Sequence, residues 1–320
     1  MVRLGAMGDI LHALPAVTAL RAAHPDWQID WVLESRWKAL LTSSNSDAQI
    51  RGPQQPLVDH VYFTQTKAWG KRLLSRQTAR EIGVLRSDLR DAKYDAVIDL
   101  QGAIRSAFIG RAAKGKRFLG EDQPREQAAR WLFSERVKTI GAHVIQQDIE
   151  LVSALAGDQL VPMPPLLPVD PAAEAWCDGF LAPHAGQPIA ILNPGAGWGA
   201  KRWPVECYTA VAQSLIQRGM LVVVNAGPGE EPLARAIEAG TGGAAVPLVA
   251  PLEKLIALTR RIALFVAGDT GPLHLACALG RPVVGIYGPT DPTRNGPFGS
   301  NAVVLRSPFG RRVAVKEKRP

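Results

Sequence analysis

Short apolar runs alternate with amphipathic stretches of helical period through the second half of the chain. The runs are bounded by Gly, Pro and Asn, which is typical of buried strands between turns. They predict strands at residues 188–192, 221–225, 245–248, 262–267 and 283–287. The stretches between them predict helices at residues 205–218, 233–239, 252–260 and 273–279. Strands that alternate with helices indicate a parallel sheet covered by helices.

The first half shows the same alternation. Apolar runs predict strands at residues 2–4, 28–33, 61–63, 94–100 and 117–120. Helical periodicity predicts helices at residues 10–23, from 104 onwards, at 130–133 and at 143–155. The strand at 2–4 is shorter than a normal strand, and we expect it to begin before the first residue of this sequence.

A proline-rich segment separates the two series. Residues 161–171 hold five prolines, which favours a semi-rigid extended connector over the interior of an element. A chain of 320 residues is also long for a single core. We therefore expect an N-terminal domain at 1–160, a linker at 161–171 and a C-terminal domain at 172–320. The fold class is α/β, with two Rossmann-like doubly wound domains facing a central cleft.

Composition narrows the class of protein. Apolar residues make up 47% of the chain, yet no apolar run is long enough to span a bilayer and no signal sequence opens it. Three separated cysteines without a CxxC pair suggest neither a disulfide framework nor a zinc site, and fit a cytoplasmic location. The formal charge of +8 favours an acidic partner: a nucleotide, a phosphorylated sugar or an anionic lipid surface. No nucleic-acid-binding motif accompanies the basic residues, so a nucleic acid is the least favoured of the possible acidic partners.

One stretch, residues 266–292, concentrates polar side chains where predicted strands end. Asp269, Thr270 and Gly271 follow the first strand, and His274 lies in the next helix. The carboxyl ends of parallel strands form the ligand crevice of such sheets, and free N–H groups at a helix N-terminus attract anions. Gly and Pro alone could mark ordinary turns, but the polar cluster favours an anion-binding site.

A glycine-rich loop follows the predicted strand at 188–192. Its sequence fits a loose GxGxxA fingerprint, but the next strand ends in Asn225, with no acidic residue for a ribose. Ala200 and Arg202 stand where a P-loop requires Gly and Ser or Thr, which argues against a nucleoside triphosphatase. The loop does place Lys201 and Arg202 just past a strand, where cations could neutralise a diphosphate.

Three other features of the first half are candidates for a role in a site. Asp9 falls at or near the N-cap of the first helix, and capping alone can explain an aspartate there. The basic stretch 64–80, which includes Lys67 and Arg72, is either a solvated helix face or the mouth of an anionic-substrate site. Arg105 opens a helix after the strand at 94–100, on the crevice side.

Three separated blocks resemble the bacterial lipopolysaccharide heptosyltransferases, glycosyltransferase family 9. They are RLGAMGDILHALP near the N-terminus, YDAVIDLQGAIRSA in the middle and DTGPLHLACALGRPVVGIYGPTDP near the C-terminus. The resemblance covers nearly the whole chain and is strongest to the members that add the first heptose. It implies a GT-B fold and an inverting transfer of L-glycero-D-manno-heptose from ADP-heptose to Kdo of Kdo2-lipid A.

The resemblance also implies roles for single residues. Asp9 matches the aspartate regarded as the general base, and Lys201 matches the lysine on the ADP phosphates. Asp269, Thr270, Gly271 and His274 match the donor-binding turn. Glu230 or Glu231 matches a glutamate on the adenosine ribose, and the alignment leaves that choice open.

Other matched positions concern the acceptor. Arg105 and Arg125 match basic acceptor-binding positions, and Lys67 and Arg72 fall in a loop that would meet lipid phosphates or Kdo carboxylates. No metal cofactor is expected. The implied location is cytoplasmic, peripheral to the inner membrane, with the basic N-terminal domain in contact with anionic lipid.

Two departures from the family and three alternatives accompany this interpretation. The first strand is short, and a basic tail, RRVAVKEKRP, replaces the long terminal helix that usually packs back on the N-terminal domain. The chain could instead be a family 9 transferase of the second or third heptosyltransferase type. Less probable are a GT-B-like nucleotide-sugar epimerase and a nucleotide-sugar-binding protein without catalysis.

Overall fold

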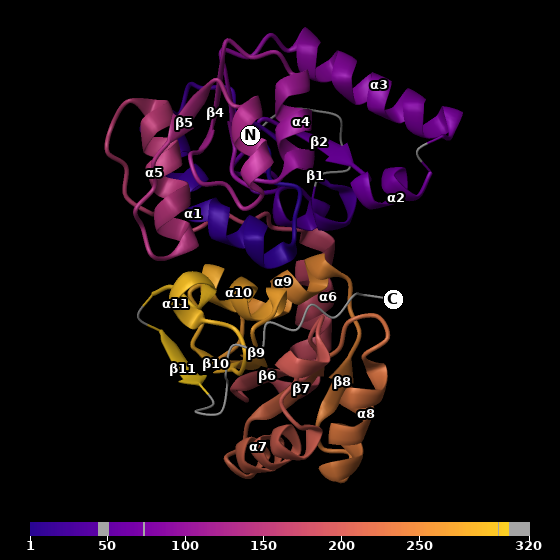
Figure 1. The fold of residues 1–320 in the computed structure, drawn as a ribbon. Helices are drawn as coiled ribbons and strands as arrows, with labels where there is room; N and C mark the ends of the chain where they lie inside the picture. Colours follow the sequence, from indigo (N-terminus) through magenta and orange to yellow (C-terminus); the bar gives the residue numbers. More distant parts are fainter. Residues whose placement is uncertain (44–50, 73, 300, 307–320) are drawn as a thin grey trace. The chain divides into compact units, whose positions relative to one another are not determined.

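The computed structural model describes residues 1–43, 51–72, 74–299 and 301–306. The chain folds into two compact units, Met1–Asp170 (unit 1) and Pro171–Pro320 (unit 2). Each unit has its own parallel sheet with helices on both faces, as Figure 1 shows. The basic tail at 311–320 lies outside the described residues.

The first four residues form the centre of the sheet in unit 1. Val2 pairs in parallel with Val32 of β1 (Asp30–Glu34) and with Asp99 of β3 (Ala96–Asp99). Its N–H donates to the Ile98 carbonyl at 2.9 Å, so the strand predicted at 2–4 is reduced to bridges at Val2 between these two strands. This segment joins a two-stranded and a three-stranded sheet. The other strands are β2 (His60–Thr64), β4 (Arg117–Glu121) and β5 (Glu135–Val137).

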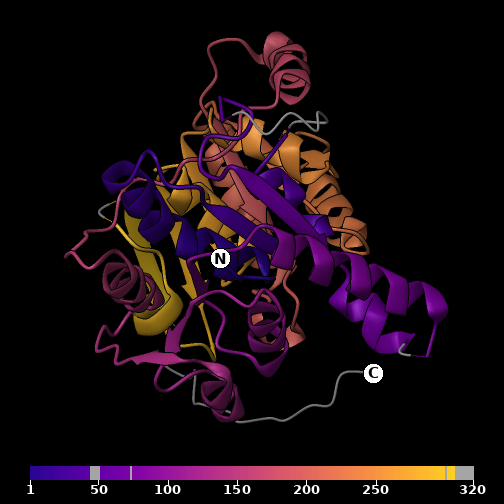
Figure 2. The same cartoon turned by 90° about the horizontal axis from the view of Figure 1, so that it is seen from above.

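Helices cover both faces of this sheet. Helices α1 (Met7–Ala23) and α5 (Val144–Ala156) pack together on one face. On the other face, α4 (Ile104–Ala112) packs on β3 and against α3 (Arg76–Asp91). Helices α2 (Thr66–Lys71) and α3 extend away from the sheet (Figure 2). The 3-10 helices are η1 (Ser35–Leu40) and η2 (Gln127–Leu132), so the helix predicted at 130–133 is a 3-10 turn.

Unit 2 contains a six-stranded parallel sheet in the order β11-β10-β9-β6-β7-β8. The strands are β6 (Ile189–Asn193), β7 (Leu221–Asn225), β8 (Val246–Leu248), β9 (Leu264–Gly268), β10 (Val283–Tyr287) and β11 (Ala302–Arg306). The two middle strands, β6 and β9, are flanked by paired strands on both sides. Their continuous apolar runs follow from that burial.

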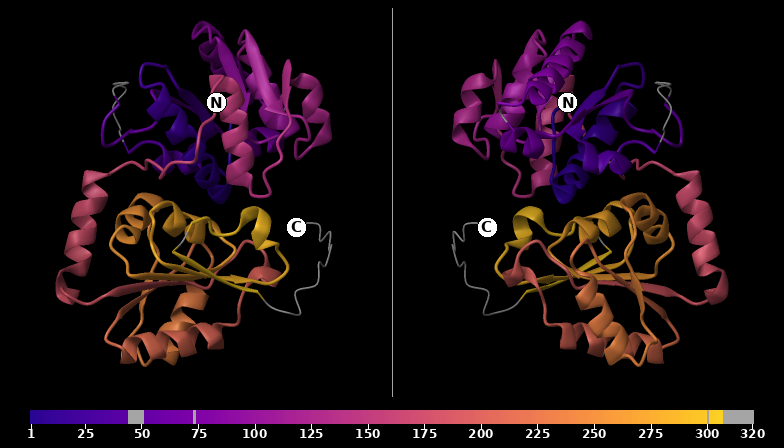
Figure 3. Two further views of the ribbon diagram at one scale, coloured as in Figure 1. Left: turned by 90° about the vertical axis from the view of Figure 1, so that its left-hand side faces the viewer. Right: turned by 90° about the vertical axis from the view of Figure 1, so that its right-hand side faces the viewer.

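Two layers of helices enclose the sheet of unit 2 (Figure 3). One layer holds α7 (Val205–Gln217) and α8 (Glu231–Gly240). The other holds α9 (Leu252–Thr259), which packs against α6 (Pro171–Leu181), and α10 (Gly271–Ala278). Short helices η3 (Ala182–His184), η4 (Gly199–Lys201) and α11 (Pro292–Asn295) lie in connections. The order of the strands reverses between β6 and β9, which in this fold class marks the ligand-binding edge.

Residues 161–170 form no regular element and lie along unit 1. The N–H of Met163 donates to the Pro15 carbonyl at 3.2 Å, and that of Val169 donates to the Pro53 carbonyl at 2.8 Å. Because prolines lack an N–H group, only a few such bonds can hold this segment in place.

Candidate functional site

Asp9 lies in the first turn of α1, directly after the central strand of unit 1. The helix begins at Met7, so Asp9 is its third residue, which agrees with the predicted position at or near the N-cap, Ala6. Its Oδ2 accepts a hydrogen bond from the Ala6 N–H at 3.0 Å, and its carbonyl accepts one from Arg3 Nε at 3.1 Å. The half-buried carboxylate is therefore fixed at the carboxyl edge of the sheet.

The neighbouring turn, between β3 and α4, is built on buried Asp99. Its carboxylate accepts hydrogen bonds from the N–H of Gln101 at 2.8 Å and from the hydroxyl of Ser106 at 2.8 Å. Burial raises the pKa of Asp99 to about 6, although these hydrogen bonds oppose the rise. The side chain of Gln101 accepts a bond from the Leu4 N–H at 2.7 Å and so ties this turn to the strand that precedes Asp9.

Arg105 and Arg125 come from two segments in direct contact. The Glu126 N–H donates to the Gly102 carbonyl at 2.9 Å, and Glu126 Oε2 accepts from the Ile104 N–H at 2.8 Å. Gly102 has a φ of +63°, and a Cβ there would lie 3.0 Å from the Arg125 nitrogen. Both arginines are exposed, and neither forms an ion pair with any residue that the structure describes.

Lys67 and Arg72 lie on and just after α2, which follows β2 at the same edge. The helix is held by two contacts: Glu34 Oε1 accepts from the Thr66 N–H at 3.0 Å, and Trp69 Nε1 donates to Glu81 Oε2 at 2.7 Å. Trp69 is buried, whereas Lys67 and Arg72 are exposed. All five residues predicted for unit 1 thus belong to segments that follow carboxyl ends of its strands.

Asp269 is the centre of the predicted site in unit 2. Its Oδ2 lies 2.5 Å from Lys201 Nζ and its Oδ1 lies 3.3 Å from His274 Nε2. Burial on its own would raise the pKa of Asp269. The hydrogen bonds from His274 and Lys201 outweigh that effect and hold the pKa well below its usual range. The carboxylate therefore stays ionised and fixes the lysine ammonium over the carboxyl end of β9.

Thr270 and Gly271 lead from that strand into α10. Thr270 is the N-cap, and its hydroxyl donates to the Gly268 carbonyl at 3.3 Å. Its side chain makes no capping bond to the helix, so the first N–H groups of α10 remain open to a ligand. Gly271 is the first helical residue and has no side chain to obstruct them.

The glycine-rich loop after β6 packs against this turn. A Cβ on Gly268 would lie 2.9 Å from the Lys201 carbonyl oxygen, so the close approach of η4 requires a glycine. Arg202 behaves differently from its neighbour: its Nε and terminal nitrogen both donate to the Ala196 carbonyl at 3.3 Å. Of the two cations predicted to be able to neutralise a diphosphate, Arg202 is therefore engaged in fastening its own loop.

The two adjacent glutamates occupy different environments. Glu230 Oε2 accepts from the Gly227 N–H at 3.1 Å, and a Cβ on Gly195 would lie only 1.9 Å from the same oxygen. The Glu230 carboxylate thus lies between the loops that follow β6 and β7. Glu231 is the first residue of α8.

Two buried asparagines at this edge were missed as site components. Asn225 Nδ2 donates to Asn193 Oδ1 at 2.6 Å, and Asn193 Nδ2 donates to the Gly195 carbonyl at 3.0 Å. They join the ends of β7 and β6 to the glycine-rich loop. A polar residue that closes an otherwise apolar strand was the available signal, because a buried amide needs partners.

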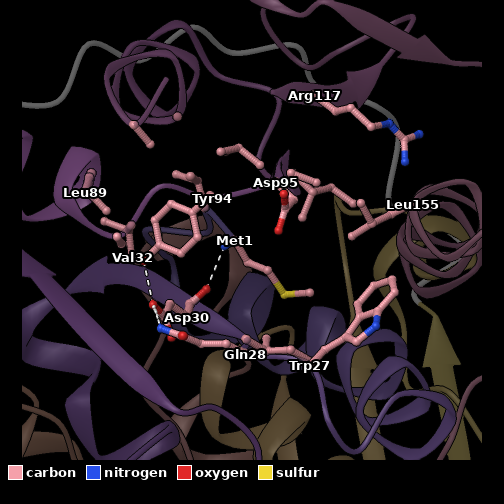
Figure 4. A pocket seen from close by; sticks show the side chains of 18 of the residues that line it. Met1, Trp27, Gln28, Asp30, Val32, Leu89, Tyr94, Asp95, Arg117 and Leu155 are labelled. Atoms are coloured by element: carbon pink, nitrogen blue, oxygen red, sulfur yellow. Dashed lines mark hydrogen bonds between the residues drawn. The ribbon is translucent and has the colours of Figure 1, made fainter. Parts of the chain in front are cut away.

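A cavity of about 620 Å³ lies elsewhere in unit 1, at the amino ends of the strands. Figure 4 shows Gln28 and Tyr94 converging on Asp30, whose Oδ2 accepts from the Tyr94 hydroxyl at 2.5 Å and from Gln28 Nε2 at 3.1 Å. Its lining contains none of the predicted site residues, and it opens at the edge opposite to Asp9.

The described part of the chain contains neither a metal-binding cluster nor a helix able to span a membrane. No group of three or more His, Cys, Asp and Glu side chains is arranged there to hold a metal ion. Within the same residues, no helix combines the length and the apolar character that a membrane span requires.

The chain matches a known family and known structures. The family model for glycosyltransferase family 9 (heptosyltransferase) matches residues 82–320. Lipopolysaccharide heptosyltransferase 1 of Escherichia coli K12 is 30% identical over 310 residues, covering 96% of this chain and 93% of the relative. The structure of E. coli heptosyltransferase WaaC with ADP superposes with a TM-score of 0.80 at 28% identity, covering 98% and 94% of the two chains. WaaC with ADP-2-deoxy-2-fluoro heptose gives a TM-score of 0.78 at the same identity and coverage.

Proposed function

Because this chain belongs to glycosyltransferase family 9, the heptosyltransferases, we propose that it moves L-glycero-D-manno-heptose from ADP-heptose to Kdo of Kdo2-lipid A. The protein is a glycosyltransferase enzyme with GT-B architecture. The observation that supports the donor most directly is the Lys201–Asp269–His274 cluster beside the open N-terminus of α10. The relatives that bind ADP and an ADP-heptose analogue share this fold along nearly the whole chain.

The donor diphosphate binds at the carboxyl edge of unit 2. Lys201 supplies the positive charge. Asp269, whose lowered pKa keeps its carboxylate ionised, orients the Lys201 ammonium. The N–H of Gly271 donates to the phosphates, and Thr270 and His274 line the turn that holds them. Since these residues provide the charge needed by the leaving ADP, we expect no metal cofactor.

Glu230, not Glu231, binds the adenosine ribose in this proposal. Its carboxylate lies between the two loops that follow β6 and β7, as described above. A carboxylate at this point of a Rossmann-like sheet accepts hydrogen bonds from the ribose hydroxyls.

Asp9 acts as the general base on the acceptor. Its carboxylate removes the proton from the acceptor hydroxyl while the oxygen forms a bond to the anomeric carbon of the heptose. The bond from that carbon to the phosphate oxygen breaks, and the electron pair leaves with ADP, whose charge Lys201 and α10 stabilise. A single displacement of this kind inverts the anomeric configuration.

The acceptor is bound by basic residues of unit 1. The exposed arginines Arg105 and Arg125, with Lys67 and Arg72 from α2, suit the carboxylates of Kdo and the phosphates of lipid A. Guanidinium groups pair with carboxylates in two parallel hydrogen bonds, which positions as well as attracts them.

The direct test is the release of ADP from ADP-heptose by the purified protein, with and without de-acylated Kdo2-lipid A. We expect release only when this acceptor is present, together with a product heavier by one heptose. Release without any acceptor would indicate the epimerase alternative, and donor binding without release would indicate a later acceptor or a binding protein. The comparisons do not favour these alternatives.

We further propose that the enzyme is cytoplasmic and binds the inner membrane through α2 and α3. Lys71, Arg76 and Arg80 are exposed there, and Leu74 between the two helices is fully exposed. A lysine or arginine near an anionic bilayer contributes about 1 kcal/mol. An apolar tip among such cations fits the interface between headgroups and acyl chains.

Reversing these three charges in Lys71→Glu/Arg76→Glu/Arg80→Glu is expected to weaken sedimentation with phosphatidylglycerol vesicles at least about tenfold. The matched control reverses exposed cations of unit 2, Arg218→Glu/Arg235→Glu, and should sediment as the parent protein does. None of the three proteins, the parent, the variant or the control, should sediment with neutral phosphatidylcholine vesicles. Equal vesicle binding by all three proteins would locate the membrane contact elsewhere.

A further inference from the structure

Trp198 is half exposed in the glycine-rich loop of unit 2, although the loop around it is well ordered by hydrogen bonds. Its side chain is 52% exposed. Its carbonyl accepts from the Lys201 N–H at 3.1 Å, and the Arg202 N–H donates to the Gly199 carbonyl at 3.0 Å. A large aromatic ring that keeps about half of its surface exposed on a constrained loop offers that surface to a ligand.

The ring lies beside the proposed diphosphate site. Lys201 Nζ is 5.6 Å from the centroid of the Trp198 ring and 2.5 Å from the Asp269 carboxylate. The η4 turn that follows Trp198 crosses the ends of β9 and β10, since Cβ atoms on Gly268 and Gly288 would lie 2.9 Å and 3.7 Å from its carbonyl oxygens. Lys201 therefore links the ring to the anion-binding turn.

The order of the strands separates the η4 turn, which follows Trp198, from the proposed ribose site. Glu230, proposed for the ribose, follows β7, whereas η4 lies over β9 and β10 in the order β10-β9-β6-β7. A nucleotide sugar with its ribose at Glu230 and its diphosphate at Lys201 directs its sugar away from β7. That direction leads to the side of the edge where Trp198 and η4 lie.

We propose that Trp198 is the platform on which the transferred sugar of the donor stacks, and so distinguishes the nucleotide sugar from free ADP. This inference rests on the proposed function. The flat apolar face of an indole suits the C–H face of a sugar ring. The same electron-rich face also attracts positive charge, which the anomeric centre develops as the phosphate leaves. The open space around Gly197 and Gly199, where a Cβ would have no atom within 4 Å, leaves room for the sugar.

The test is calorimetric titration of the full chain with ADP and with ADP-2-deoxy-2-fluoro heptose. We expect Trp198→Ala to raise the Kd of the sugar analogue about tenfold while the Kd of ADP changes less than about twofold. Trp198→Phe, which keeps an aromatic face, should recover most of the loss. The matched control is Trp176→Ala, which removes another tryptophan of unit 2 with a lysine, Lys254, 4.9 Å from its ring centroid, and should alter neither Kd.

Each result separates this inference from the function on which it rests. Equal weakening of ADP and of the analogue by Trp198→Ala would mean that the ring stacks on the adenine, and the proposal would be wrong. Unchanged binding of both ligands, with a raised KM for the acceptor, would assign the ring to the acceptor and also overturn it. If the unaltered protein bound no ADP, the proposed function itself would fail. An unchanged Tm of the variant shows that the loop change has not unfolded unit 2.

Discussion

Replacing Asp9 with asparagine is expected to lower kcat about a thousandfold, because the amide cannot accept the proton of the acceptor hydroxyl. The donor Kd should stay unchanged, since the donor-binding residues belong to unit 2. The measurement is the steady-state rate of acceptor-dependent ADP release, with donor affinity determined separately by calorimetry.

The choice of asparagine separates catalysis from folding. The Asp9 carboxylate also accepts a hydrogen bond from the Ala6 N–H in the first turn of α1, at 3.0 Å. An asparagine oxygen can keep that bond, whereas Asp9→Ala loses it at a cost of about 1 kcal/mol in stability. Both variants should therefore be inactive, but only Asp9→Ala should show a lower Tm. Near-normal turnover by Asp9→Asn would assign the base to another residue.

Lys201→Ala is expected to lower kcat/KM by about two to three orders of magnitude and to weaken ADP binding as well. The change removes the cation proposed for the diphosphate and leaves the Asp269 carboxylate, only 11% exposed, facing the incoming phosphates. Without the lysine, the pKa of Asp269 should move up from its lowered value. The result is measured as kcat/KM for ADP-heptose and as the Kd of ADP.

Arg202→Ala is the matched control for this second prediction. The two cations are adjacent in sequence, but the guanidinium of Arg202 is bound to the Ala196 carbonyl rather than to Asp269. Its loss should loosen the loop and change kcat/KM far less than the loss of Lys201. If the two variants lost activity equally, general positive charge would matter, and the specific role of Lys201 would be refuted.

Much of the fold was predictable because its strands are strongly apolar and end at turn residues. Strands β7 and β10 have the predicted bounds. Strand β5 has no apolar pattern to predict it, because its three residues, Glu135–Val137, include two charges at an edge of the sheet. Helix α6 was also missed, because it begins at Pro171, within the run of prolines assigned to the linker. Short edge strands and helices that begin at proline depend on tertiary contacts more than on local pattern.

The candidate site was predictable in composition but not in orientation. Residue types at strand ends identified Asp269, Thr270 and His274, and the structure brings Lys201 to them. The sequence did not separate Glu230 from Glu231, because the difference arises from the contact of Glu230 with the loop at Gly195. Nor did it show that Arg202 turns back on its own loop, which depends on how that loop closes.

The four glycines around this loop differ in how much change they tolerate. At Gly268 a single added carbon would lie 2.9 Å from the backbone carbonyl oxygen of Lys201, and at Gly195 it would lie 1.9 Å from the Glu230 carboxylate and displace that side chain. At Gly197 and Gly199 the backbone φ is ordinary and an added carbon meets nothing within 4 Å. Gly268 is therefore closed to substitution by the backbone beside it, and a substitution at Gly195 would move the Glu230 carboxylate. Gly197 and Gly199, on either side of the exposed tryptophan, have room for a side chain. Libraries at Gly197 and Gly199 are consequently the natural starting point for engineering the enzyme to accept another sugar.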